Sequence, residues 1–141
     1  MAVEFQLSEY AKMPHLGTQD SVGYDLYSTS DVTIGPLQME KIDTGLIIKS
    51  ITKDIYIQII SRSGLALKKS LFSCGGLIDP DYKGAINVLL YNGSTEIRTI
   101  NRGERIAQML FLPISRPTSS TLNTKPIKTE RGISGFGSTG I

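Results

Sequence analysis

Only one cysteine and one histidine occur among the 141 residues, and tryptophan is absent. The single cysteine, Cys74, excludes a disulfide within the chain, and a zinc site built on Cys and His needs three or four such ligands. A catalytic triad needs a histidine beside its nucleophile, whereas His15 lies in a loop-like stretch with no nucleophile motif nearby. A bound metal would therefore rest on oxygen ligands, which favours Mg²⁺ or a similar hard cation.

Long apolar runs are also missing. No segment approaches the roughly 18 apolar residues of a membrane span, and the N-terminal MAVEFQLSEYAKMP is polar where a signal peptide would be apolar. A content of 40% hydrophobic and 20% charged residues is not typical of an intrinsically disordered protein or of a membrane protein. We expect one soluble, intracellular domain, in the cytoplasm or the nucleus, without a membrane partner.

The net charge of +2 is too small to indicate a nucleic-acid binder, and we expect no direct nucleic-acid contact. Its distribution is uneven. Residues 1–97 hold 8 Lys and Arg against 11 Asp and Glu, which gives −3, whereas residues 98–141 hold 7 against 2, which gives +5. The basic final third is either a solvated surface or a tail that meets a polyanion, for which the phosphates of a small ligand would suffice.

Glycine and proline interrupt the chain so often that most intervals are shorter than a normal helix. Residues 46–63 form the longest uninterrupted stretch, and their alternating isoleucines predict a strand. Residues 105–111 fit a strand or a helix. Further short strands are predicted at residues 32–34, 85–91 and 96–100, with Asn92-Gly93 as a hairpin turn between the last two. This pattern predicts an all-β sandwich or barrel.

The C-terminal part differs in composition. Residues 115–128 are polar, contain two prolines and show no apolar periodicity, which indicates an extended arm. The following RGISGFGSTG has a composition typical of disorder, yet its Arg131, Phe136 and Ser-Thr pair also offer a charge, a stacking face and phosphate donors. We therefore divide the chain into a core of residues 1–114 and an arm of residues 115–141.

Four further segments could contribute to a site, and each also has a plain structural explanation. Asp25 in SVGYDLYS could be a strand-start acid, and RSGLALKK at residues 62–69 begins with a short, common tripeptide. In GGLIDPDYKG at residues 75–84, the Asp-Pro-Asp sequence predicts a β-turn that presents carboxylates and a ring. Gln108 in GERIAQM interrupts an apolar run, either because it faces solvent on an edge strand or because it serves a site.

Taken together and in this order, GYDLYS, RSGLA, GGLIDPDYKG, GERIAQM and RGISGFGSTG resemble the five motifs of the homotrimeric dUTPases, the deoxyuridine triphosphate nucleotidohydrolases. The resemblance runs from about residue 20 to residue 140. It implies a jelly-roll-like β-sandwich with an extended C-terminal arm, and a homotrimer whose sites are shared between subunits. It also implies Mg²⁺-dependent hydrolysis of dUTP to dUMP and pyrophosphate, which keeps uracil out of DNA.

The resemblance assigns a role to each matching residue. Asp79 and Gln108 are implied to be catalytic: Asp79 activates the water that attacks the α-phosphorus, and Gln108 lies near that phosphate and the attacking water. Asp25 is implied to hold Mg²⁺ through water. Tyr82 is implied to pack against the deoxyribose. The remaining implied substrate-binding residues are Arg62, Ser63 and Gly64 for phosphate, Gly76, Leu77, Ile78 and Asn87 around uracil, and Arg131, Phe136, Gly137, Ser138 and Thr139 in the closing arm.

Three positions depart from the family pattern: Ser61, Pro80 and Ser134. We expect Ser61 to loosen its turn and Ser134 to restrict the arm slightly. Pro80 matters because the related dCTP deaminases carry a similar Asp-Pro dipeptide, although they place a catalytic glutamate where this chain has Leu89. A dCTP deaminase-like enzyme and a catalytically silent dUTPase-like binding module therefore stay open as alternatives.

Overall fold

The computed structural model describes residues 2–125 and 127–140. These residues form eleven strands and one short helix. The elements are β1 Glu4–Leu7, β2 His15–Leu16, β3 Tyr24–Tyr27, β4 Val32–Ile34, β5 Met39–Ser50, β6 Ile55–Ile60, α1 Ser63–Lys69, β7 Leu71–Cys74, β8 Leu77–Ile78, β9 Ala85–Asn92, β10 Arg98–Ile100 and β11 Arg105–Pro113.

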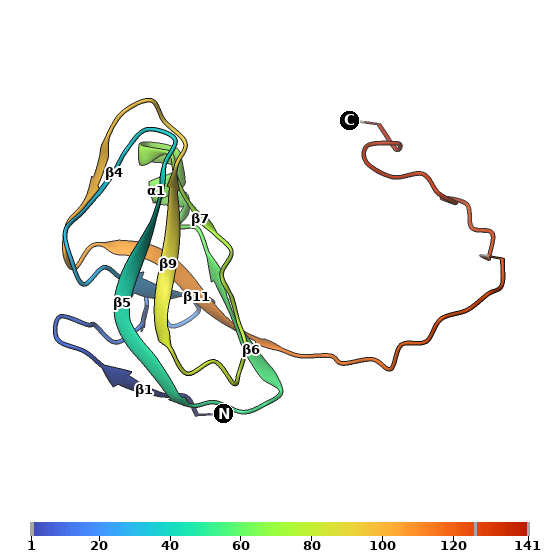
Figure 1. The fold of residues 1–141 in the computed structure, drawn as a ribbon, viewed down its shortest axis with the longest axis horizontal. Coiled ribbons are helices and arrows are strands. Elements are labelled where there is room, and N and C mark those ends of the chain that lie inside the picture. The colour runs from blue at the N-terminus through green and yellow to red at the C-terminus, as the bar shows by residue number, and fades with distance from the viewer. Residues whose placement is uncertain (1, 126, 141) are drawn as a thin grey trace.

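The strands pair antiparallel in two main sheets and one small ladder. The first sheet has the order β1-β5-β9-β7, the second has the order β2-β3-β11-β6-β8, and β4 pairs with β10. In Figure 1, β5 and β9 of the first sheet lie in front of β11 of the second. Alternate residues of β9 are buried, as expected for a strand with one face on a core. The predicted all-β, jelly-roll-like sandwich is confirmed.

The prediction of a single strand over residues 46–63 is wrong. The chain turns after β5, where the Ile55 N–H donates to the Thr52 carbonyl at 3.3 Å, and it enters α1 after β6. Helix α1 ends at Ser70, which adopts a left-handed φ of 54° and donates its N–H to the Ala66 carbonyl. A helix of seven residues with only Leu65 buried is too short to leave an apolar period in the sequence.

The predicted Asn92-Gly93 hairpin is also wrong, because β9 and β10 belong to different sheets. The Asn92 side chain is fully buried, and its amide nitrogen donates to the carbonyls of Ile34 at 3.1 Å and Glu96 at 2.7 Å. The Gly93 N–H donates to the Ser70 carbonyl at 2.8 Å. Tertiary hydrogen bonds therefore turn the chain from one sheet to the other.

Residues 105–111, which fitted a strand or a helix, lie in β11, and β11 leads into the arm. The Ile114 N–H donates to the Asp54 carbonyl at 2.7 Å, and Arg116 donates to the Lys53 carbonyl at 3.3 Å. The pKa of the Asp54 carboxyl is lowered, first by a hydrogen bond from Thr52, then by its own N–H and the charge of Arg116.

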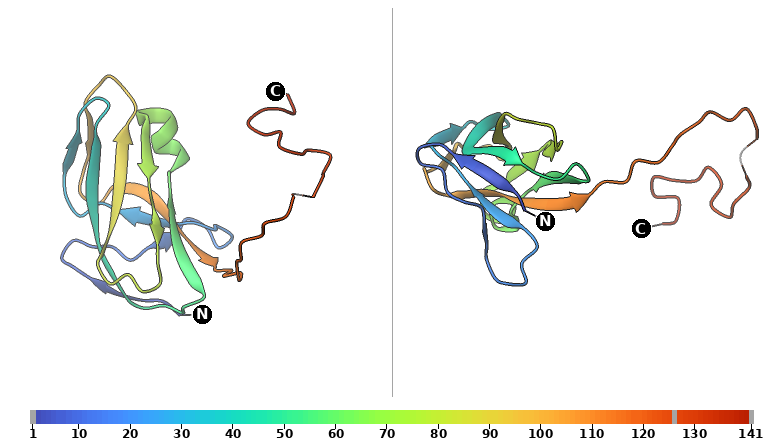
Figure 2. Two further views of the ribbon diagram at one scale, coloured as in Figure 1. Left: turned by 45° about the vertical axis from the view of Figure 1, so that its right-hand side comes forward. Right: turned by 90° about the horizontal axis from the view of Figure 1, so that it is seen from below.

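The chain that follows β11 extends away from the core in every view (Figures 1 and 2). Residue 1 of the predicted core and residues 126 and 141 of the predicted arm lie outside the described residues. The division into a core of residues 1–114 and an arm of residues 115–141 stays a prediction. None of the helices in the described ranges is both long and apolar enough to cross a membrane.

Candidate active site

A cavity of about 350 Å³ lies between β8, the turn that follows it, and β9. Six of the predicted site residues line this cavity: Gly76, Leu77, Ile78, Asp79, Tyr82 and Asn87. Cys74 and Leu89 line it too, so the chain has an apolar side chain where a deaminase would carry its glutamate. The structure thus brings together the residues that the sequence assigned to uracil, deoxyribose and water activation.

Gly76 fixes one wall of this cavity. Its φ is +97°, and its carbonyl accepts a hydrogen bond of 2.8 Å from the N–H of Ile59 on β6. A Cβ at position 76 would lie 2.6 Å from the Ile59 carbonyl oxygen. Only glycine at this position lets the two backbones approach so closely. The wall is therefore formed by backbone of fixed position.

The turn that follows β8 presents the carboxylate and the ring. The Tyr82 N–H donates to the Asp79 carbonyl at 3.1 Å, which confirms the predicted β-turn with Pro80 at its second position. The Tyr82 hydroxyl donates to the Ala85 carbonyl at 2.9 Å. Gly84 leaves room for this ring, because a Cβ there would collide with the Tyr82 hydroxyl. The ring is therefore held in one place beside Asp79.

A second cavity, of about 550 Å³, contains the charged part of the predicted site. Asp25 on β3 has a side chain only 7% exposed. Its Oδ1 lies 3.3 Å from Arg62 Nε, and its Oδ2 lies 3.3 Å from Arg105 Nη1. Despite the short distance to Arg62, Oδ1 accepts no aligned hydrogen bond from the described groups. One carboxylate thus holds two guanidinium groups, and the excess positive charge suits an anionic ligand.

Gln108 is half-buried on β11 and lies directly opposite Asp25 on β3. Its side chain packs against Gly23, where a Cβ would come within 3.1 Å of the Gln108 Cβ. Strand β11 lies between β3 and β6, so the explanation of Gln108 as an exposed edge-strand residue is wrong. Directly opposed residues project from the same face of a sheet, and Gln108 therefore stands beside Asp25.

The RSG tripeptide lies at the start of α1. Gly64 is exposed, and a Cβ there would meet nothing within 4 Å among the described residues, so the protein's own packing does not require this glycine. The Ser73 N–H donates to the Ser61 hydroxyl at 2.8 Å, and the two hydroxyls lie 3.2 Å apart. These hydrogen bonds tie the turn to β7, contrary to the expectation that Ser61 loosens it.

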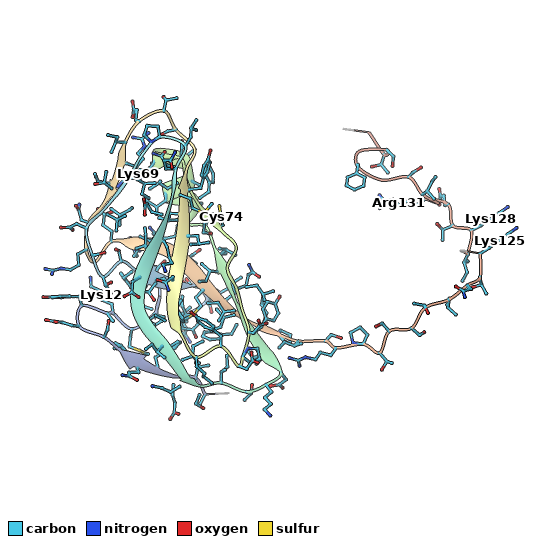
Figure 3. The ribbon with its side chains drawn as sticks, viewed as in Figure 1. Lys12, Lys69, Cys74, Lys125, Lys128 and Arg131 are labelled. Atoms are coloured by element: carbon cyan, nitrogen blue, oxygen red, sulfur yellow. The ribbon has the colours of Figure 1, made fainter. Side chains whose placement is uncertain are left out.

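No residue lines both cavities within the described ranges, and the arm lines neither. Arg131 lies on the distant part of the arm, far from Lys69 and Cys74 on the core (Figure 3). The Ser134 N–H donates to the Arg131 carbonyl at 3.1 Å, and the Phe136 side chain is fully exposed. Gly137, Ser138 and Thr139 follow on the same exposed segment. A single chain therefore does not bring all the predicted site residues together.

Besides Arg62, three side chains of the second cavity carry nitrogen donors that the sequence pattern does not assign to the site: His15, Lys69 and Arg105. Lys69 lies in the RSGLALKK segment with Arg62, and Arg105 lies in the GERIAQM segment with Gln108. This proximity in the sequence could have indicated that they belong to the site. His15 had no such signal, because only strand pairing brings it beside Asp25. Among residues 2–125 and 127–140, no group of three or more His, Cys, Asp or Glu side chains is arranged to hold a metal.

Comparison with solved structures first defines the class of protein, a β-sandwich with the dUTPase fold. The structure superposes on that of the Staphylococcus bacteriophage 80alpha dUTPase with dUpNHpp at a TM-score of 0.91. The two sequences are 27% identical, and the match covers 99% of each chain.

The sequence comparisons then identify the family. A family model for dUTPase matches residues 9–140. The chain is 44% identical over 140 residues to a deoxyuridine 5'-triphosphate nucleotidohydrolase of Fowlpox virus, covering 97% of this chain and 95% of the relative. It is 42% identical over 136 residues to the enzyme of that name in Yarrowia lipolytica, covering 96% and 86%. The chain belongs to the dUTPase family, and the predicted enzyme class is confirmed.

Proposed function

We propose that the chain hydrolyses dUTP to dUMP and pyrophosphate and thereby limits the incorporation of uracil into DNA. The observation that carries this proposal is the first cavity. One β-turn holds Asp79 and the Tyr82 ring in it, beside a wall formed by the backbone at Gly76. Relatives of about 40% identity bear the name of this activity, and a dUTP analogue occupies the phage enzyme.

In the proposed reaction, Asp79 accepts a proton from water as the water oxygen bonds to the α-phosphorus. The bond from the α-phosphorus to the bridging oxygen breaks, and pyrophosphate leaves with the bonding electrons. Gln108 orients the water and the α-phosphate. A positioned base contributes about 10²–10⁴-fold to such a step, and the remainder of the acceleration comes from orientation and charge stabilisation.

The second cavity binds the triphosphate in this proposal. Arg62 lines this cavity and offers its guanidinium. The next two residues, Ser63 and Gly64 at the start of α1, would add a hydroxyl and a backbone N–H that phosphate approaches without meeting a side chain. Arg105 adds a second guanidinium, 51% exposed, while the buried Asp25 keeps both arginines oriented. Positive groups held in place before the reaction stabilise the charge that develops on the leaving pyrophosphate.

Magnesium fits this pocket mainly through the substrate. The donor set around Asp25 is a single carboxylate that also pairs with two arginines, too little to bind the ion by itself. Among the described residues, no group donates a hydrogen bond to Oδ1, and this acceptor capacity suits a metal-bound water. Asp25 would hold the hydrated ion through water, and the bound ion would polarise the phosphates as a Lewis acid.

Base and sugar selection belong to the first cavity. Gly76, Leu77 and Ile78 offer backbone N–H and C=O groups to the uracil edge, with Asn87 across the cavity on β9. The Tyr82 ring occupies the space that a 2′-hydroxyl would need. A ribonucleotide would both collide with the ring and bury an unpaired hydroxyl.

We further propose that a homotrimer completes each site. Two separate cavities and a remote arm on one chain fit a site to which different subunits contribute different parts. The arm closes over the bound nucleotide, with Phe136 stacked on uracil, Arg131 at the terminal phosphate, and Gly137, Ser138 and Thr139 along the phosphates. Closure excludes bulk water, apart from the attacking molecule held by Asp79 and Gln108, and it adds positive charge only while substrate is bound.

Pyrophosphate release from the purified protein, measured in parallel with dUTP, dCTP, UTP and dTTP, tests the proposal. We expect release from dUTP far above the other three. Ammonia release from dCTP would instead support the deaminase-like enzyme, and absence of turnover with all four nucleotides would support the silent binding module.

A further inference from the structure

One row of side chains crosses three strands of the five-stranded sheet. His15 on β2 lies opposite Asp25 on β3, and Gln108 on β11 lies opposite Asp25 from the other side. Opposed residues in antiparallel strands project from the same face, so these three side chains stand in one row. The adjacent positions Leu16, Tyr24 and Met109 form the next row, and Met109 is fully buried in the core. The row with His15 therefore faces outward.

His15 also lines the 550 Å³ cavity, together with Arg62, Lys69 and Arg105. The acidic groups of that cavity are already paired. Asp25 pairs with both arginines. Glu104 lies 3.7 Å from Lys69 Nζ and accepts a 3.0 Å hydrogen bond from the Asn101 amide.

The His15 side chain itself is exposed. Within residues 2–125 and 127–140 it makes no side-chain hydrogen bond of its own. The imidazole thus offers an uncommitted donor on the wall of a positively charged pocket.

We infer that His15 is a further binding residue for the phosphate chain of the nucleotide. Its ring N–H donates to an oxygen of the phosphates beyond the α-phosphate. This inference rests on the proposed function, because it assigns the second cavity to the triphosphate. Asp25 on β3 stands between His15 on β2 and Gln108 on β11, so His15 lies on the side of Asp25 away from the residue proposed to orient the water and takes no part in activating it. Its loss therefore weakens binding of the triphosphate and leaves the chemical step unchanged.

The experiment measures dissociation constants for dUpNHpp and dUMP alongside steady-state hydrolysis of dUTP. We expect His15→Ala to raise the dissociation constant of dUpNHpp and the KM for dUTP about fivefold, as for one lost hydrogen bond. The kcat should stay within about twofold and the dissociation constant of dUMP should not change. His15→Asn and His15→Lys each keep a donor and should restore part of the affinity. Gln6→Ala, an exposed polar change on β1 of the other sheet, is the matched control.

Unchanged dUpNHpp affinity in His15→Ala would overturn the inference. An equal loss of dUMP affinity, or failure of both donor-keeping variants to recover any affinity, would also overturn it, because either result indicates a packing role. Failure of the proposed function has a different signature, namely a wild-type protein that releases no pyrophosphate from dUTP. The dUpNHpp measurements still test His15 in that case, since they do not depend on turnover.

Discussion

The backbones of Gly76 and Ile59 lie in direct contact. The Ile59 N–H donates to the Gly76 carbonyl at 2.8 Å, and the Ile59 carbonyl oxygen occupies the space where a Cβ of residue 76 would be, 2.6 Å away. Both partners are backbone, so no side chain can move aside to relieve a substitution. This contact fixes β8 against β6 and thereby shapes the wall of the cavity beside Asp79.

Gly76→Ala should therefore destabilise the protein more than Gly75→Ala. Both glycines have positive φ, +97° and +66°, which costs a residue with a Cβ about 1–2 kcal/mol. At Gly75 the new Cβ would meet, among residues 2–125 and 127–140, only a Leu89 methyl at 3.8 Å, whereas at Gly76 it would collide with backbone. Urea unfolding at one fixed protein concentration measures both losses. Equal losses would show that the contact between Gly76 and Ile59 relaxes freely.

Gly64→Ala should separate stability from binding. Gly64 lies in the first turn of α1 with open space around it, and replacing a helical glycine by alanine stabilises by up to roughly 1 kcal/mol. The free energy of unfolding should therefore stay the same or rise. The KM for dUTP should rise about tenfold or more, because the alanine methyl group would occupy the space that phosphate approaches. A change of one methylene in a binding pocket is worth about 1–3 kcal/mol. An unchanged KM would remove Gly64 from the phosphate site.

Asp79→Asn should lower kcat by at least about 100-fold while dUTP binding stays nearly intact, since the amide keeps the size of the side chain but cannot accept the proton. Binding of dUpNHpp and the oligomeric state serve as controls for folding. Near-normal turnover in this variant would exclude Asp79 as the base.

Tyr82→Ala should narrow the preference for dUTP over UTP, because the ring is proposed to fill the space of the 2′-hydroxyl. Tyr82→Phe is the matched control. It keeps the ring and removes only the hydroxyl that donates to the Ala85 carbonyl at 2.9 Å, so the preference should largely remain. The measurement is the ratio of kcat/KM for the two nucleotides. An unchanged ratio in Tyr82→Ala would place the discrimination elsewhere.

Deletion of residues 129–141 should preserve folding and abolish most activity. The described part of this segment is exposed and contributes nothing to the core, whereas the proposed closure needs Arg131 and Phe136. Phe136→Ala should cause part of the same loss, since stacking on a base is worth about 1–3 kcal/mol in single-strand binders. Thermal unfolding and pyrophosphate release measure the two effects. Full activity of the truncated chain would contradict arm closure.

The same deletion also tests whether subunits share their sites. Asp79→Asn chains and arm-deleted chains, each inactive alone, are unfolded together and refolded as a mixture. If the arm of one subunit closes over the Asp79 of another, the mixed trimers should recover a fraction of wild-type activity. Absence of recovery, with mixed trimers shown to form, would mean that each arm serves its own subunit's Asp79.

Local sequence signals were sufficient for the elements and turns that depend on near neighbours. The strand at residues 32–34 and most of β9 follow from β-branched residues bounded by turn residues, and the turn at Asp79–Tyr82 follows from its Pro80. The Asn92-Gly93 hairpin failed because hydrogen bonds to distant carbonyls, including that of Ile34, outweighed the local turn preference. Helix α1 escaped prediction because seven residues give no measurable period.

Residue types, short spacings and the order of the motifs along the chain were enough to predict the all-β class and the family, because these features do not depend on which segments meet. The meeting of distant segments is visible only in the folded chain. Strand pairing places Gln108, 83 residues further along the chain, on one side of Asp25, and His15, 10 residues before it, on the other side. Asp25 and Asp79 line different cavities. Sheet register and backbone contacts, such as that between Gly76 and Ile59, join segments that are far apart in the sequence. Their contact cannot be predicted from local sequence patterns, because those patterns reflect only near neighbours.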